Sequence, residues 1–139
     1  RLKRGGGAAI VPLDFETAEG EMKTHEPAVE ADVDELFYRE WVRALLERSV
    51  ADLKQAADTA GRPVMFEVFP RYDLVDEGDT RPTYTAIART LNITAATVTN
   101  HLAAMRRQFR TIVLERLREL TSSEEEWEAE ATKLLGGRR

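Results

Sequence analysis

The side chains best suited to binding another molecule lie in one stretch, residues 84–110, with the sequence YTAIARTLNITAATVTNHLAAMRRQFR. The stretch contains four arginines and one histidine but no aspartate or glutamate, although the whole chain has a net charge of −5. An arginine-rich segment without carboxylates is typical of a surface that binds a polyanion. This stretch is therefore the candidate binding site.

Charge is unevenly distributed along the chain. Residues 14–36 contain nine acidic residues and one lysine, a net charge of −8, whereas residues 81–118 contain seven arginines and one glutamate, a net charge of +6. The basic block favours a polyanionic partner, and the acidic block favours a cationic one.

Two helices are expected to meet within the candidate site. The apolar spacing predicts one helix over about residues 83–91, a tight turn at Asn92, and a long helix from 95 to about 120 with Thr94 as its N-cap. Ala88 must be small because the two helices cross closely there. This spacing is typical of a helix-turn-helix. The side chains expected to be buried are Ile87, Ala88, Leu91, Ile93, Val98, Leu102, Met105 and Phe109.

The outer face of the second helix suits the major groove of DNA. At about 100° per residue, Ala96, Asn100, Ala103 and Arg107 share the face turned away from Val98. Asparagine can bond an adenine edge, arginine a guanine edge, and alanine can contact a thymine methyl group. Hydroxyls and free amides at the start of the preceding helix commonly hold a phosphate. The candidate DNA-binding residues are Thr83, Tyr84, Thr85, Arg89, Ala96, Thr97, Thr99, Asn100, Ala103, Arg106, Arg107 and Arg110.

The residues before the candidate site predict a supporting helix. Apolar residues at three- and four-residue steps, including Phe37 and Trp41, predict an amphipathic helix of roughly seven turns whose stripe packs in a core. Asp32 or Asp34 is the expected N-cap, and Gly61 is the expected stop.

Two shorter helices complete the expected architecture. Pro63 suits the first turn of a short buried helix that should end at Pro70, followed by the surface loop RYDLVDEGDTRP. Near the end of the chain, Ser122 or Ser123 with a glutamate three residues later forms a capping box, and Gly136 is the expected stop.

The chain is expected to divide into three parts. Residues 1–31 read as the end of a preceding region and an acidic linker, residues 32–121 as the helix-turn-helix domain, and residues 122–139 as an acidic C-terminal helix or tail. The expected fold class is all-α, a small helical bundle. Because the chain opens on arginine rather than methionine, we expect a processed chain or an excised fragment.

No catalytic site, metal or cofactor is expected. Cysteine is absent, only His25 and His101 could offer imidazole ligands, and no serine or carboxylate lies in a recognisable catalytic motif. His101 is expected to be a partly buried packing residue. No apolar run approaches the ~20 residues that a membrane span needs, so no membrane partner is expected. We expect a non-enzymatic protein.

The chain resembles the carboxy-terminal part of extracytoplasmic-function (ECF) RNA polymerase sigma factors. In one subgroup, an F-x-x-E-W-x-x-x-L-L helix leads to a Y-x-x-I-A-x-x-L hairpin and a T/A-V-x-x-x-x-x-x-L/M-R-R helix. The run KRGGG at 3–7, followed by an acidic linker, is also similar to these factors. The matching residues are Phe37, Glu40, Trp41, Leu45, Leu46, Tyr84, Ile87, Ala88, Leu91, Thr97, Val98, Met105, Arg106 and Arg107.

The resemblance implies concrete partners and a cytoplasmic, bacterial transcription protein. The helical domain would be sigma region 4, which binds the −35 promoter element through its second hairpin helix and the β flap of RNA polymerase through its apolar surface. Residues 14–31 would occupy the RNA-exit channel, and an anti-sigma factor could cover the apolar surface. Region 2 is not in these residues, so this fragment alone is not expected to initiate transcription. Ala95 and Ala96 replace the polar residues common in the family, which leaves the promoter preference open.

Other interpretations stay open at this point. A LuxR-type helix-turn-helix regulator would be a dimer on a palindromic site, and a helical adaptor would bind only protein. An ordinary bundle helix with a solvated arginine face is the simplest alternative. The acidic C-terminal helix could fold back and mask Arg107 and Arg110, or it could be a solvated tail anchored by Trp127 and Leu134.

Overall fold

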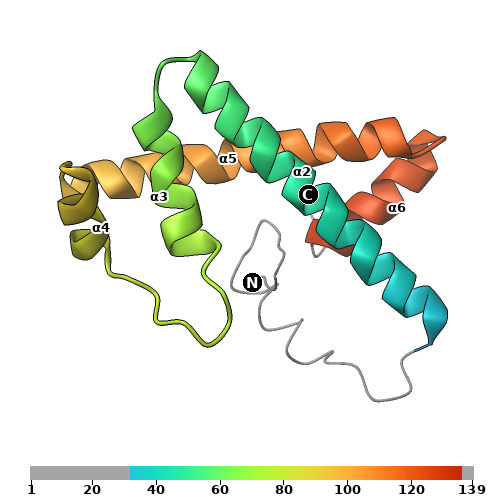
Figure 1. The fold of residues 1–139 in the computed structure, drawn as a ribbon. Helices are drawn as coiled ribbons and strands as arrows, with labels where there is room; N and C mark the ends of the chain where they lie inside the picture. Colours follow the sequence, from blue (N-terminus) through green and yellow to red (C-terminus); the bar gives the residue numbers. More distant parts are fainter. Residues whose placement is uncertain (1–31, 136–139) are drawn as a thin grey trace.

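The computed structural model describes residues 32–135, which form five helices and no strand (Figure 1). The all-helical class predicted from the sequence is confirmed for these residues. The predicted linker, residues 1–31, and the predicted stop at Gly136 lie outside the described residues. None of the described helices combines the length and the apolar character needed to cross a membrane. In chain order the helices are α2 (Val33–Thr59), α3 (Pro63–Asp73), α4 (Tyr84–Leu91), α5 (Ala95–Leu120) and α6 (Glu124–Leu135).

α2 begins and ends where its sequence predicts. The Asp32 carboxylate accepts a hydrogen bond from the Glu35 backbone N–H at 2.8 Å, so Asp32 is the N-cap. Beyond the C-cap residue Ala60, Gly61 has a φ of +74°, a left-handed conformation that glycine adopts without strain. Both ends of the predicted helix are therefore confirmed.

The apolar stripe of α2 is covered over only part of its length. Trp41 is half-buried and packs against the core, as predicted. The prediction that Phe37 packs in the core is wrong, because its side chain is 70% exposed. A stripe with four-residue steps winds slowly around a helix, and the first turns of α2 extend beyond α5 in Figure 1. The apolar residues of α2 that are buried are Leu45, Leu46, Leu53 and Ala57.

α3 begins at Pro63, as predicted, but it does not end at Pro70. The helix continues through Pro70 to Asp73, so that prediction is wrong and the following loop starts three residues later than expected. Proline lacks a backbone N–H and removes one helical hydrogen bond. The last turn persists because the Leu74 N–H donates to the Pro70 carbonyl at 3.3 Å, because Tyr72 packs against the ring of Tyr84 in α4, and because Asp73 accepts hydrogen bonds from Arg106 in α5.

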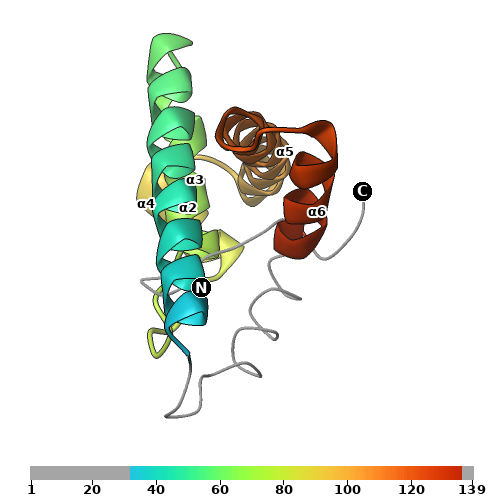
Figure 2. The ribbon, with the colours of Figure 1, turned by 90° about the vertical axis from the view of Figure 1, so that its right-hand side faces the viewer.

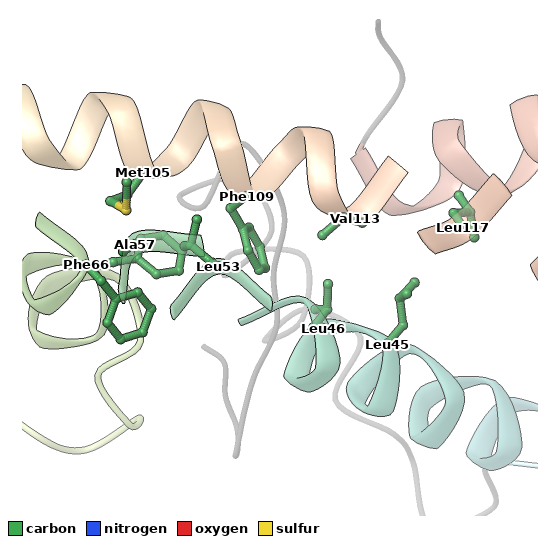
Figure 3. Close-up of a cluster of buried hydrophobic side chains, with 10 residues drawn as sticks. Leu45, Leu46, Leu53, Ala57, Phe66, Met105, Phe109, Val113 and Leu117 are labelled. Carbon is green, nitrogen blue, oxygen red and sulfur yellow. The ribbon is translucent and has the colours of Figure 1, made fainter. Parts of the chain in front are cut away.

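α5 is the central helix, as Figure 2 shows by looking nearly along its axis. The larger core cluster lies between α2, α3 and the middle of α5. Figure 3 shows Leu45 and Leu46 of α2 turned toward α5, which contributes Phe109, Val113 and Leu117. A smaller cluster joins the end of α3 to α4 and the start of α5. Its buried members are Val68, Ile87, Ala88, Val98 and Leu102.

α6 packs against α5 and α2 through one side. The indole N–H of Trp127 donates to the Leu114 carbonyl of α5 at 3.0 Å, and the Tyr38 hydroxyl of α2 donates to Glu130 at 3.3 Å. Burial raises the pKa of Tyr38, and the adjacent Glu130 carboxylate raises it further. Trp127, Ala131 and Leu134 contact the larger core cluster, but no residue of α6 is fully buried. The predicted anchoring by Trp127 and Leu134 is confirmed.

Candidate nucleic-acid interface

α4 and α5 are joined by a turn of three residues, 92–94. Asn92 closes α4 in the left-handed conformation, with a φ of 61°, which asparagine tolerates better than most residues. The Ile93 N–H donates to the Ala88 carbonyl at 2.9 Å, which satisfies one of the last carbonyls of α4. Ala88 itself is only 6% exposed. The predicted turn and the predicted burial of Ala88 are confirmed.

Threonine side chains fix the start of both helices. Thr83 Oγ1 accepts a hydrogen bond from the Ala86 N–H at 3.0 Å, and Thr94 Oγ1 accepts one from the Thr97 N–H at 3.0 Å. The predicted N-cap of α5 at Thr94 is therefore confirmed. These bonds hold the first turns of α4 and α5 in a defined orientation.

The face of α5 predicted to bind DNA is open to solvent. Its side chains are not packed inside the protein. His101 is half-buried, as predicted. On α4, Thr83, Thr85 and Arg89 are exposed, whereas Tyr84 is half-buried. Thr97 and Arg110 of α5 are also half-buried. The exposed candidate residues of α5 are Ala96, Thr99, Asn100, Ala103 and Arg107.

Aromatic and arginine side chains cluster at the start of α4. The ring of Tyr84 meets Tyr72 of α3 edge to face, with centroids 4.9 Å apart, and the Arg81 guanidinium lies 4.6 Å from the Tyr72 ring centroid. These three residues, together with Pro82 and Thr83, line a shallow, open hollow. Tyr84 therefore packs between helices. Sequence reasoning missed Tyr72 and Arg81, because they lie before Thr83, the first residue of the candidate set.

Arg106 differs from the other arginines of the candidate site. Its guanidinium donates to both carboxylate oxygens of Asp73 in α3, with N–O distances of 2.6 and 2.7 Å. The Asp73 side chain is only 1% exposed, so this ion pair joins α3 to α5 at the edge of the core. The positive charge predicted to attract phosphates is thus largely offset. Asp73 follows Phe66 by seven residues, a spacing that places both on one helical face and could have indicated its burial.

Three candidate arginines have no partner of this kind. Arg89, Arg107 and Arg110 form no ion pair within residues 32–135. In contrast, Arg116 near the end of α5 donates to Asp52 of α2, and Arg118 donates to Glu124 at 2.7 Å. Within the candidate site, the arginines without an ion pair to a described residue therefore lie on α4 and in the middle of α5.

The acidic helix α6 does not cover these arginines. It contacts the second half of α5 through Trp127 and Arg118, at the end of α5 opposite α4 (Figure 1). No ion pair between α6 and Arg107 or Arg110 is found in the described part of the chain. The predicted masking of these two arginines is not seen in this arrangement.

Residues 32–135 contain no group of three or more histidine, cysteine, aspartate or glutamate side chains placed to hold a metal ion. Comparison of the chain with protein-family models, with curated proteins and with solved structures gives no match.

Proposed function

We propose that the chain is the DNA-binding part of an ECF-type sigma factor, with α4 and α5 as a helix-turn-helix whose second helix enters the major groove of the −35 promoter element. One observation carries the proposal. The first half of α5 exposes small side chains and the amide of Asn100, and the unpaired arginines Arg107 and Arg110 follow directly. Small side chains let a helix approach base edges closely, and arginines supply the attraction to phosphates.

The arrangement of the two helices supports the same proposal. In helix-turn-helix proteins the second helix lies in the groove while the first crosses the backbone. Here α4 is only eight residues long and is held against α5 by the small core cluster. Its exposed Thr85 and Arg89 are available for phosphates when α5 is in the groove.

A sigma factor also needs a surface for RNA polymerase. Exposed apolar side chains gather at the start of α2, where Val33 is 63%, Leu36 50% and Phe37 70% exposed. Grouped apolar exposure on a small protein commonly marks a binding surface. We assign this apolar surface to the β flap, the contact that the sigma resemblance implies.

Selection from a pool of random duplexes at fixed salt tests the proposed DNA binding. We expect one enriched site without palindromic symmetry, bound by a single copy of the chain. A palindrome bound by two copies would favour a LuxR-type regulator. Failure to bind or enrich any duplex would contradict the proposal and favour a protein-binding adaptor.

A pair of amide substitutions tests whether α5 contacts the bases. Asn100→Ala should weaken binding to the selected duplex by ~1–3 kcal/mol, the usual value for a bidentate base contact. Gln55→Ala is the matched control, because Gln55 is an exposed amide on α2, outside the candidate site. Equal affinities of the two variants would contradict base contact by Asn100.

Capture of RNA polymerase core enzyme tests the sigma assignment separately. The chain should retain the core enzyme, and Phe37→Ser should reduce the retained amount without changing DNA affinity. Arg48→Ala, another exposed position on α2, serves as the control. Full DNA binding with no retention of polymerase would reject the sigma assignment while leaving DNA recognition intact.

A further inference from the structure

The first three turns of α5 and the turns that follow carry different kinds of side chain. Residues 95–105 contain no arginine, lysine, aspartate or glutamate, whereas arginines occur at positions 106, 107 and 110. The division matters because arginine and lysine are the usual readers of guanine, and carboxylates accept from cytosine. The first three turns of α5 have neither.

Within these turns, internal hydrogen bonds occupy most of the polar side chains. Thr94 Oγ1 donates to Thr97 Oγ1 at 2.8 Å, and Thr99 Oγ1 donates to the Ala95 carbonyl at 3.2 Å. Asn100 is exposed, and its amide forms no hydrogen bond within residues 32–135. It is therefore the side chain of this segment best able to bond a base edge, and its preferred bidentate partner is adenine.

Methyl groups flank this amide on both sides. Ala96 precedes Asn100 by one turn and Ala103 follows it by nearly one turn, so both lie within about 60° of it around the helix. Both alanines are exposed. In the major groove, an alanine methyl has one favourable apolar partner, the C5-methyl group of thymine.

We infer that the first three turns of α5 read thymine methyl groups and one adenine edge, while Arg107 and Arg110 hold phosphates. The inference rests on the proposed function, and it names the base chemistry that the same surface accepts. Arg107 follows Asn100 by seven residues, or ~10 Å along the helix, and lies on nearly the same side. The part of α5 that discriminates sequence is thus separate from the part that supplies electrostatic attraction.

Base analogues in the selected duplex test this inference directly. Replacement of a thymine by deoxyuridine removes only the C5-methyl group, and 7-deazaadenine removes only the N7 acceptor. At fixed salt we expect deoxyuridine to weaken binding about fourfold at one or two positions, the value of one buried methyl group. We expect 7-deazaadenine to weaken binding roughly tenfold at one position.

Substitutions in the protein assign each effect to a side chain. With Ala103→Ser, replacing thymine by deoxyuridine should no longer weaken binding at one of the sensitive positions. With the control Ala44→Ser, at an exposed alanine of α2, deoxyuridine should weaken binding at every position where it does so for the parent. Asn100→Ala should abolish the 7-deazaadenine effect and leave the salt dependence unchanged. Arg107→Ala should lower the slope of log K against log salt by about 1 without changing either analogue effect.

The outcomes separate this inference from the proposed function. A selected site rich in guanine, or analogues that change affinity less than twofold at every position, would overturn the inference while DNA binding stands. Analogue effects that persist unchanged in both Ala103→Ser and Asn100→Ala would also overturn it. Absence of any duplex binding would overturn the inference together with the proposed function.

Discussion

The arginines in the middle of α5 and those near its C-terminal end have different surroundings. Near its end, Arg116 is paired with Asp52 of α2, and Arg118 is paired with Glu124 and lies 4.0 Å from the centroid of the Trp127 ring. In the middle of the helix, Arg107 and Arg110 have no such partner among the described residues. The same residue type therefore stabilises the fold where another helix brings a carboxylate to it. Where none does, its charge remains available to an external anion.

Arg106 lies beside Arg107 in the middle of α5 but is paired with Asp73, and its replacement should give the largest effect on stability. Arg106→Met keeps the length of the side chain but removes the ion pair between its guanidinium and the buried Asp73 carboxylate. We expect a loss of about 3 kcal/mol in the free energy of unfolding, the lower end for a buried pair because Arg106 is partly exposed. Urea unfolding at pH 7 measures this loss.

DNA binding by the same variant tests whether Arg106 contacts phosphates. If the main role of Arg106 is to stabilise the fold through its ion pair with Asp73, Arg106→Met should change the salt dependence of DNA binding much less than Arg107→Ala does. A variant of unchanged stability whose salt slope falls by about 1 would contradict this, and would place Arg106 among the phosphate contacts.

Replacement of Trp127 should give the next largest loss of stability. The loss should come from the contacts between α6 and α5. Trp127→Ala removes a half-buried ring, the hydrogen bond to Leu114 and the contact with Arg118. We expect a loss of about 2 kcal/mol, roughly half the cost of removing a fully buried tryptophan. Thermal unfolding followed by circular dichroism measures it, and Trp127→Phe should lose less.

DNA affinity of the same variant tests whether α6 masks the interface. Because α6 bonds to α5 at Leu114 and Arg118, beyond Arg110, and forms no ion pair with Arg107 or Arg110 among the described residues, Trp127→Ala and removal of residues 122–139 should leave affinity at fixed salt within twofold of the parent. A clear gain in affinity would instead favour masking of Arg107 and Arg110.

The smallest expected change in stability comes from removing the ion pair of Asp52 and Arg116. The hydrogen bond from Arg116 lowers the pKa of Asp52, so the pair stabilises the protein above the ordinary pKa of aspartate, near 4, and loses this contribution as the pH falls below it. Asp52→Asn should be slightly less stable than the parent at pH 6, and less affected than Arg106→Met. The difference in urea midpoint should shrink toward pH 3. A constant difference across this range would contradict the role of the charge.

The local features of the fold could be predicted from the sequence because their causes are local. The caps at Asp32 and Thr94, the left-handed turn at Asn92 and the stop at Gly61 each depend on side chains within a few residues. Helix periodicity likewise predicted which side of α5 is buried. The exposed face at Asn100 followed from the same periodicity.

The features that sequence reasoning missed depend on contacts between distant segments. Asp73 lies 33 residues from Arg106, and Asp52 lies 64 residues from Arg116, so a count of charges in one window could not show that these arginines are neutralised. The continuation of α3 beyond Pro70 depends on the same long-range contacts. Phe37 was assigned to the core because periodicity gives the side of a helix but not the length over which it is covered.

The salt dependence of duplex binding by two matched double variants shows which arginines of α5 contact DNA phosphates. Arg107→Ala/Arg110→Ala and Arg116→Ala/Arg118→Ala remove the same charge from the same helix. The account predicts that the first pair weakens binding and lowers the slope of log K against log salt by about 2, while the second leaves the slope unchanged. Equal slopes for the two variants, or a larger change from the second, would contradict it.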